Sequence, residues 1–421
     1  IIRRLRNFAR KPSEATNMRS RLAGLWALQM AGYLIPLITI PLLARRLGPD
    51  GWSAMAWAQS LGLAAGIFLE YGFNLSATRA VSRFREDPGN LRVVVGQTLG
   101  AQACVLSGLV IAFLTLTSIG TPVRTGMSGL AWFGLLWTVP QSVSLQWLFH
   151  GLDRVGALAM AMFAARVLSW GAIWLWVRGP EDAGWALACQ SIPTMLVLAP
   201  LGWWVLRPVG WEWPTMGGIA RVLRDGAALF WYRIGLVGFA AAVPAMLAGQ
   251  HGPQELAWFS GAERLARAGT SLLDPVGALL YPRWARELAA PRRGEAMGKR
   301  VAAVAGMGLA LSLALYWLAD PLVRLLLGER FAPSTKMLSI LAWLPCGHAL
   351  ASVLGTQGLL AMGADRLVLV SYLVTAGAGL AAQGWFAPDA VGTAWLCVGL
   401  LALQGIWFGS VFLWRYRRNA C

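Results

Sequence analysis

The sequence predicts an all-α polytopic membrane protein with about twelve transmembrane helices, arranged as two six-helix bundles related by pseudo-two-fold symmetry. Hydrophobic residues make up 57% of the 421 residues, whereas charged residues make up only 13%. A helix needs about 20 mainly apolar residues to cross a bilayer, so this apolar content is sufficient for about twelve crossings. The composition excludes a water-soluble enzyme, a disordered chain and a disulfide-rich secreted protein.

Apolar runs bounded by charged residues, Gly or Pro predict where the helices lie. The first run follows a basic segment, but it is too long for a signal-peptide core and has no clear small-residue cleavage site, so we expect a retained helix. The predicted spans are residues 22–43, 52–70, 93–118, 127–149, 156–177, 184–206, 228–248, 256–281, 301–327, 337–361, 367–386 and 391–414.

Basic residues are distributed unequally between the two sets of connecting segments. If the N-terminus is cytoplasmic, 25 Lys and Arg residues fall in cytoplasmic segments and 7 on the opposite side. The positive-inside rule therefore places both termini in the cytoplasm. The formal net charge of +17 is mainly this topology signal, together with attraction to anionic lipid headgroups, and nucleic acid is not an expected partner.

Two equivalent Gly-Pro pairs indicate an internal repeat. Gly48-Pro49 precedes the second span, and Gly252-Pro253 precedes the eighth, 204 positions later. Six spans per repeat predict two parallel repeats. The expected domains are a basic cytoplasmic N-terminal segment 1–21, a first bundle 22–206, a cytoplasmic linker 207–227, a second bundle 228–414 and a cytoplasmic tail 415–421.

Four arginines lie inside the predicted spans, where a charge at the bilayer centre costs at least about 2.5–3.5 kcal/mol. They are Arg166, Arg233, Arg264 and Arg267. Their side chains are candidates for a cationic cavity that binds a diphosphate, because guanidinium groups stay charged and present several donors. Alternatively, Glu263 neutralises Arg267 four residues later, and Arg166 and Arg233 snorkel or bind helix carbonyls.

Carboxylates at the ends of two spans are candidates for gating or coupling. Glu70 and Asp274 occupy equivalent positions of the repeat, and Glu263 lies deeper in the eighth span. A partly desolvated carboxylate titrates nearer to neutral pH, as coupling to protons would require. The alternative is that Glu70 and Asp274 pair with Arg79 or Arg283 at the helix ends.

The sequence contains no motif for nucleotide binding, metal binding or hydrolysis. We find no P-loop, HExxH or GxSxG pattern and no Cys/His spacing typical of a metal site. No predicted loop exceeds about 22 residues, so no soluble catalytic domain fits between the spans. We therefore expect no cofactor, no metal and no catalytic residue.

Several segments resemble the Wzx-type polysaccharide (O-antigen) flippases of the multidrug/oligosaccharidyl-lipid/polysaccharide exporter superfamily. Residues 41–51 (PLLARRLGPDG) and 69–79 (LEYGFNLSATR) are similar to the end of the first helix and the exit of the second. Residues 259–287 (FSGAERLARAGTSLLDPVGALLYPRWARE) are similar to the eighth, and residues 325–334 (LLLGERFAPS) and 356–363 (TQGLLAMG) fit the later helices.

The resemblance implies two bundles around a central cavity that opens alternately to either side of the bacterial inner membrane. It implies a flippase, not an enzyme, that moves undecaprenyl-diphosphate-linked oligosaccharide to the outer leaflet for O-antigen or exopolysaccharide biosynthesis. The implied partners are this lipid-linked oligosaccharide, membrane lipids and a polysaccharide polymerase. Cationic cavity residues attract the diphosphate in this family, and the four arginines fit that role by location.

Three alternatives remain open from the sequence. The sequence poorly distinguishes a polysaccharide flippase from a lipid II flippase. A drug/cation antiporter of the same superfold favours a carboxylate-centred site, whereas the predicted interior is net positive. A membrane-embedded enzyme that modifies glycans needs a large outer loop or a His/Asp pair at the membrane surface, and neither stands out.

Overall fold

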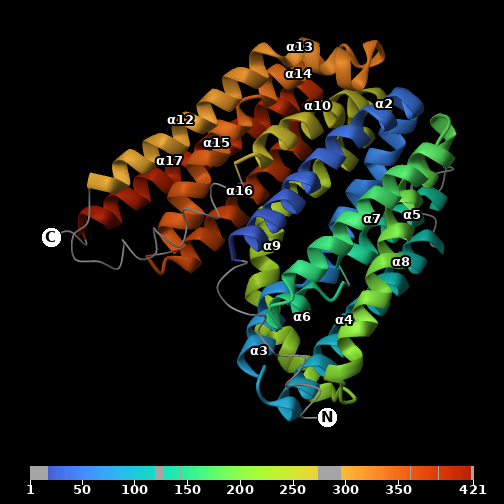
Figure 1. Ribbon diagram of the computed structural model, residues 1–421. Coiled ribbons are helices and arrows are strands. Elements are labelled where there is room, and N and C mark those ends of the chain that lie inside the picture. Colours follow the sequence, from blue (N-terminus) through green and yellow to red (C-terminus); the bar gives the residue numbers. More distant parts are fainter. Residues whose placement is uncertain are drawn as a thin grey trace. The chain divides into compact units, whose positions relative to one another are not determined.

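The structure is a computed structural model in which every regular element of the described residues is helical (Figure 1). Each of the twelve predicted spans overlaps helical residues in the part of the chain that the structure describes. Among the described residues, eight helices are long and apolar enough to cross a membrane, or nine if the bent pair Val301–Trp317 and Ala319–Leu327 counts as one span. The described residues are 18–118, 128–142, 144–273, 295–360, 362–386 and 388–418.

The difference between twelve and nine has three local causes, the simplest being that the described helix of the fourth predicted span, Gly129–Pro140, is too short to count as a crossing. The helix α2 (Met18–Glu70) contains the first two predicted spans on either side of one kink. The helix α10 (Pro253–Ser271) covers most of the described part of the eighth predicted span, but its four charged side chains make it less apolar than the helices that qualify as crossings. Four charged residues are unusual in a helix with so many buried residues. The positions of these charged side chains matter for the site described below.

Both Gly-Pro pairs form the same turn. Gly48 has φ 61° and ψ −175° at the kink of α2, and Gly252 has φ 90° and ψ 178° immediately before α10. Only glycine adopts this combination without strain, and a proline in the first turn of the next helix lacks an N–H that would have no partner there. The matching backbone conformations support the internal repeat inferred from the sequence.

The chain divides into two compact units, each described here by itself. Unit 1 comprises the described residues within 1–39, 65–177 and 184–230, and unit 2 comprises those within 40–64, 178–183 and 231–421. This division differs from the predicted domains at residues 40–64, 178–183 and 207–230. Residues 40–64 pack with the C-terminal unit, and the predicted linker 207–227 packs within the N-terminal unit.

Unit 1 contains most of the N-terminal helices. Its core includes Phe73, Val81 and Trp147, which are almost completely buried. A Cβ added to Gly151 would lie 2.5 Å from the Val81 side chain and 3.2 Å from the Thr78 carbonyl, so this glycine allows two of the helices to pack closely. The helices of this unit are α3 (Phe73–Arg83), α4 (Pro88–Ser118), α5 (Ser128–Ser142), α6 (Gln146–Gly151), α7 (Val155–Trp176) and α8 (Ala183–Val209), with the first part of α9 (Met216–His251).

The predicted linker belongs to unit 1 because it packs directly on α4. The Glu212 N–H donates to the carbonyl of Arg92 at 3.2 Å, and the Arg92 Nε–H donates to the carbonyl of Val209 at 3.4 Å. A Cβ at Gly96 would overlap the Glu212 backbone, which explains the glycine on that face of α4. The segment is thus part of the bundle's packing.

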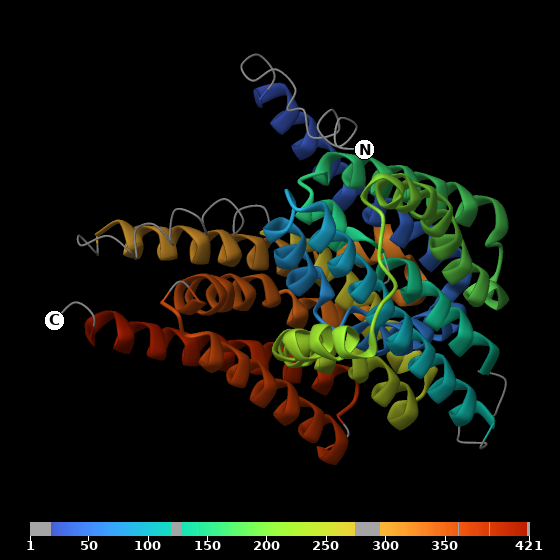
Figure 2. The ribbon, with the colours of Figure 1, turned by 90° about the horizontal axis from the view of Figure 1, so that it is seen from below.

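Unit 2 contains the remaining helices, and α12, α15 and α17 lie side by side in it (Figures 1 and 2). Glycines allow these close approaches: a Cβ at Gly308 would lie 2.6 Å from the Ala349 side chain, and one at Gly347 would lie 3.0 Å from the Leu401 side chain. The helices are α10, α12 (Glu295–Trp317), α13 (Ala319–Leu322), η3 (Val323–Leu327), η4 (Glu329–Phe331), α14 (Ser334–Leu341), α15 (Leu344–Leu350), η5 (Ala351–Leu359), α16 (Asp365–Phe386) and α17 (Ala390–Arg418).

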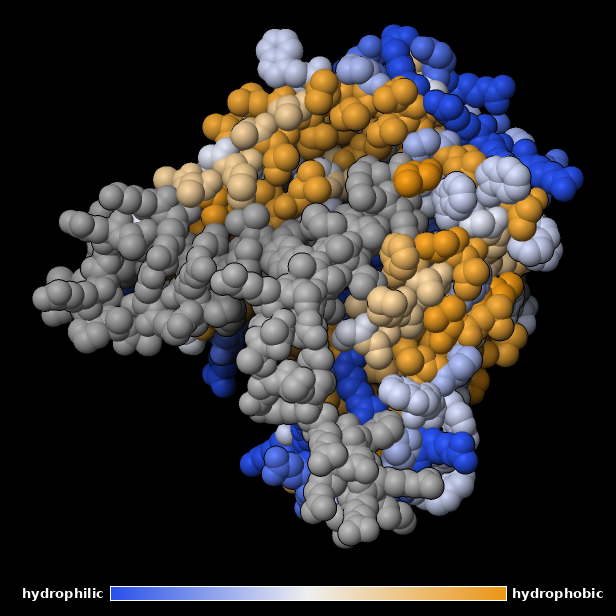
Figure 3. All heavy atoms as spheres, in the orientation of Figure 1, coloured by the Kyte–Doolittle hydropathy of each residue, from blue (hydrophilic) through white to orange (hydrophobic). Residues whose placement is uncertain are grey.

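The outer face of α12 indicates contact with lipid. Figure 3 shows hydrophobic side chains over the visible part of this helix. Leu309, Leu313 and Trp317 are among its exposed residues. A large exposed apolar surface of this kind is unusual in a soluble monomer, so it fits a helix that faces the hydrocarbon core.

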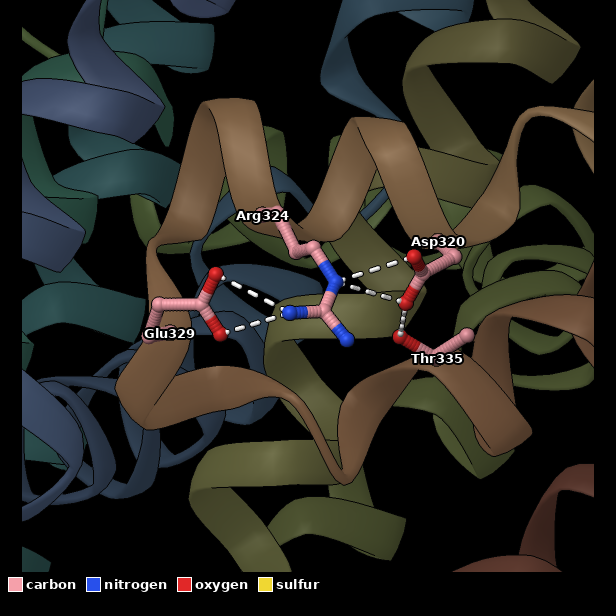
Figure 4. Close-up of polar contacts among 4 residues, drawn as sticks. All are labelled: Asp320, Arg324, Glu329 and Thr335. Carbon is pink, nitrogen blue, oxygen red and sulfur yellow. Dashed lines mark hydrogen bonds and ion pairs between the residues drawn. The ribbon is translucent and has the colours of Figure 1, made fainter.

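The turn between α13 and α14 is fixed by one arginine. Arg324 donates to Asp320 at 2.9 Å and to Glu329 at 2.8 Å, and Asp320 also accepts from the Thr335 hydroxyl at 3.4 Å (Figure 4). All three charged side chains are at least half exposed. Exposed pairs contribute at most about 1 kcal/mol each, so this network orients the turn more than it stabilises the fold.

Candidate functional site

A cavity of about 670 Å³ lies inside unit 2, among α9, α10, α15, η5, α16 and α17. Its wall is mainly apolar, with a small set of polar side chains that converge on it. This combination is typical of a ligand site. The polar residues that matter below are Glu263, Arg267, His348, Ser352, Thr375 and Gln404.

The helix α10 contributes the charged part of the cavity. Glu263, Arg267 and Thr270 follow one another at spacings of four and three residues, which places them on one face of the helix. Leu265 and Ala266, on another face, are buried in the protein. The Glu263 and Arg267 side chains therefore project from one face of α10 into the cavity.

Glu263 and Arg267 form an ion pair, as their spacing suggested. The Arg267 Nη2 and Nε groups donate to one carboxylate oxygen of Glu263 at 2.7 and 3.0 Å. The Arg267 side chain is 56% exposed and that of Glu263 is 16% exposed. Since a guanidinium has five N–H donors, three of them are left for a ligand after this pairing.

The pairing changes the expected electrostatics of this cavity. Glu263 and Arg267 have opposite charges, and His348 is the other titratable nitrogen base on the wall. The formal charges of Glu263 and Arg267 cancel, and only one of the four predicted arginines lines this cavity. Its local character is that of an exposed guanidinium held in place by a more buried carboxylate.

Arg264 lies three residues from Arg267 and has a different environment. Its guanidinium lies 4.4 Å from the ring centroid of Trp52 and donates to the side-chain oxygen of Gln59. Trp52 is fully buried and donates its indole N–H to Ser260 at 3.1 Å. Arg264 thus joins α10 to the second half of α2, which explains why residues 40–64 pack with unit 2.

The other two candidate arginines do not line this cavity. Arg233 is half-buried on α9, beside the lining residue Tyr232. Arg166 is exposed on α7, in unit 1. Of the four arginines in the predicted site, the structure brings only Arg267 to the wall of this cavity.

The carboxylates proposed for gating are only partly described. Glu70 ends α2 and accepts a hydrogen bond from the Asn74 amide at 3.0 Å. The next residue, Tyr71, stacks on Phe230 with ring centroids 4.6 Å apart, so Glu70 lies beside a packed aromatic contact in unit 1. Asp274 and its suggested partner Arg283 lie outside the described residues.

Several polar cavity residues were missed by the sequence analysis. Ser352, Thr375 and Gln404 are isolated polar residues within apolar runs, and each lines the cavity. A buried amide in the last span was a usable signal, because uncharged polar groups in a membrane helix need a partner. Within the described ranges, no group of three or more His, Cys, Asp or Glu side chains is placed to hold a metal ion.

Solved structures with the same fold are membrane transporters. An inward-facing multidrug resistance MATE family transporter of the MOP superfamily matches with a TM-score of 0.63 at 15% identity, covering 92% of this chain and 98% of the other. The lipid II flippase MurJ, in an inward closed conformation, matches with a TM-score of 0.65 at 10% identity, covering 93% and 87%. The fold is therefore that of a polytopic membrane transporter.

Sequence comparison identifies the family. A family model described as "Polysaccharide biosynthesis protein" matches residues 23–287, more than half of the chain, and the chain belongs to that family. Two curated relatives share the name "Putative O-antigen transporter". The protein of Escherichia coli (strain K12) is 25% identical, covering 82% of this chain and 84% of the relative. That of Shigella dysenteriae is 22% identical, covering 85% and 90%.

Proposed function

We propose that the protein is a flippase that moves an undecaprenyl-diphosphate-linked oligosaccharide across the bacterial inner membrane, from the cytoplasmic to the outer leaflet. The transport cycle is alternating access, with both termini in the cytoplasm. The family, the transporter fold and the two relatives named for O-antigen transport support the class of substrate. A polysaccharide polymerase that consumes the flipped oligosaccharide is the expected partner.

The observation that carries this proposal is the position of Arg267. Its guanidinium is exposed in a cavity of a transporter fold and is oriented by Glu263. The planar guanidinium matches the geometry of a diphosphate and retains its charge when water is excluded. Binding of the diphosphate would compete with Glu263 for the guanidinium, and this exchange offers a way to release the substrate after translocation.

Uncharged polar groups around Arg267 suit the sugar that follows the diphosphate. Ser352 and Thr375 offer hydroxyl groups, and Gln404 offers an amide. The cavity volume of about 670 Å³ falls within the roughly 300–1,000 Å³ that is typical of ligand sites. We assign this cavity to the diphosphate and the sugar nearest to it.

A drug/cation antiporter is less well supported by this geometry. Such a transporter needs a carboxylate that is available to a cationic drug, whereas the Glu263 carboxylate is engaged by Arg267. A lipid II flippase has the same fold, but a match at 10% identity carries no information on the glycan. An experiment is therefore needed to distinguish the antiporter and the lipid II flippase from the proposed flippase.

Leaflet assignment in cells that lack the protein tests the proposal. We expect a diphosphate-linked oligosaccharide to accumulate in the inner leaflet, inaccessible to membrane-impermeant reagents, and to reach the outer leaflet when the protein is restored. Normal outer-leaflet glycan in a cell without another flippase would contradict the proposal and favour drug or ion export. Accumulation of lipid II alone would identify a lipid II flippase.

A further inference from the structure

An apolar groove of about 660 Å³ lies along α16 and α17, next to the cavity. Arg366, Val370, Val374 and Ala378 follow one another every four residues and form its α16 wall. Leu403, which is 66% exposed, is on the opposite wall with its neighbours on α17. The groove therefore has a hydrocarbon-like wall and one cationic group, at the N-terminal end of α16.

The groove and the cavity share a wall. Thr375, Leu400 and Gln404 line both spaces. The two helices are held together nearby by the Trp407 indole N–H, which donates to the Ser371 hydroxyl at 2.9 Å. A molecule in the groove would therefore lie one side chain away from the site assigned to the diphosphate and sugar.

Gln404 has an unused donor at this shared wall. The residue is 6% exposed, and its Nε2 has no hydrogen-bond partner among the described residues. Gln383, also buried and on α16, donates to Gln250 at 3.1 Å and accepts from Thr393 at 3.2 Å. The Gln383 amide therefore has hydrogen-bond partners within the protein, as a structural amide should. The Gln404 N–H donor is available to a ligand.

We propose that this groove is the entry site of the lipid-linked substrate: it binds the isoprenoid chain with a phosphate at Arg366, before the headgroup moves past the Gln404 amide to Arg267 in the cavity. The inference rests on the proposed function, since that function supplies the isoprenoid substrate. The observations that favour this occupant are the single cationic end, the apolar walls and the continuity with the polar cavity.

The length and direction of the groove fit a chain from the cytoplasmic leaflet. Arg366 and Ala378 are twelve residues apart, or about 18 Å along the helix at 1.5 Å per residue. This is close to half of the roughly 30 Å hydrocarbon core. Arg366 belongs to the segment 362–366, which we expect to be cytoplasmic, so a phosphate there would leave its chain running toward the bilayer centre.

Photo-crosslinking in proteoliposomes tests the site with an isoprenyl phosphate probe that carries a benzophenone on its chain. We expect the label to map to α16 and α17 and to be displaced by undecaprenyl phosphate, but not by the same concentration of phosphatidylglycerol. Labelling confined to other helices would overturn the proposal. Equal displacement by phosphatidylglycerol would overturn it as well, because the groove would then be a general phospholipid site.

Two tryptophan variants form a matched pair on α17. Leu403→Trp fills the groove, whereas Leu413→Trp changes a residue of the same helix that is 55% exposed and outside the groove lining. We expect about tenfold less labelling in Leu403→Trp and unchanged labelling in Leu413→Trp. Equal labelling of the two would overturn the proposal, provided that both variants unfold at the wild-type temperature.

The phosphate contact is tested by charge. Arg366→Gln should weaken binding of undecaprenyl phosphate about tenfold, and Arg366→Lys should restore most of it. Unchanged binding of undecaprenyl phosphate to Arg366→Gln would show that the phosphate does not bind at this end of the groove.

Glycan flipping in the same liposomes separates this inference from the proposed function. Specific labelling of the groove without flipping of any lipid-linked glycan would support isoprenoid binding in the groove and would refute the proposed flippase function. Flipping that proceeds normally in Leu403→Trp would retain the function and refute the groove.

Discussion

Arg264 and Arg267 lie one helical turn apart on α10 and differ in almost every other respect. Arg264 is half-buried, stacks on Trp52 and binds Gln59, so its charge is used within the protein. Arg267 is mostly exposed in the cavity, and a single carboxylate orients it. The comparison teaches that an intramembrane arginine is not by itself a substrate site, because the helix face decides whether its donors remain available.

The largest expected effect is on the buried side of this comparison. Trp52→Ala removes a completely buried ring that contacts Arg264, Ser260 and Phe331. Loss of a buried aromatic side chain lowers the free energy of unfolding by about 3–5 kcal/mol. We expect a large decrease in the thermal unfolding temperature in detergent. A variant as stable as the wild type would contradict the packing of α2 against α10.

Arg264→Ala should be the next most harmful to stability. It leaves the Gln59 amide without its donor and the Trp52 ring without its cation, at a cost of about 2–3 kcal/mol. Arg264→Lys should recover little, because an ammonium lacks the planar fork that stacks on the ring and reaches the amide. Thermal unfolding of both variants measures this. Wild-type stability of Arg264→Ala would show that its contacts with Trp52 and Gln59 do not stabilise the fold.

A smaller effect is expected at the turn that orients the Trp52 segment. Gly48→Ala forces a side chain into the positive-φ conformation of the α2 kink and should cost about 1–2 kcal/mol. Gly252→Ala is the matched variant in the second repeat, with the same backbone conformation. We expect similar losses of thermal stability in the two. A loss in one alone would show that the two turns are not structurally equivalent.

The smallest effect on stability is expected for Arg267→Ala. Its ion pair with Glu263 is largely exposed on the arginine side, so its removal should change the free energy of unfolding by less than about 1 kcal/mol. Transport should nevertheless fall strongly. A thermal unfolding temperature that decreases as much as in Arg264→Ala would show that Arg267 has a structural role and would remove the contrast between them.

Features that depend on local sequence were predictable. The Gly-Pro turns, the order of the helices and the pairing of Glu263 with Arg267 follow from spacing and backbone chemistry, and the structure contains all three. The role of Arg264 was not predictable in this way. Its partners Gln59 and Trp52 lie about 200 positions earlier in the chain, and nothing in the eighth span shows which face meets them.

The same limit applies to the domains and to the polar cavity. Hydropathy assigned residues 40–64 to the first bundle by chain order, whereas packing of Trp52 and Arg264 places them in unit 2. Gln404 was not identified as a site residue, because its value depends on a wall that α16 and α17 form together. Sequence patterns predict where the helices lie. Contacts between residues far apart in the chain determine which face of each helix packs against which neighbour.

One measurement tests the role of Arg267 most directly. Flipping of a diphosphate-linked oligosaccharide is measured in liposomes, per folded protein, for Arg267→Ala and for Arg324→Ala, which removes another arginine paired with an acid four residues earlier. Arg324 is outside the cavity lining. We predict that Arg267→Ala abolishes flipping while Arg324→Ala retains it. Equal, wild-type flipping in both variants would contradict the assignment of Arg267 to the diphosphate.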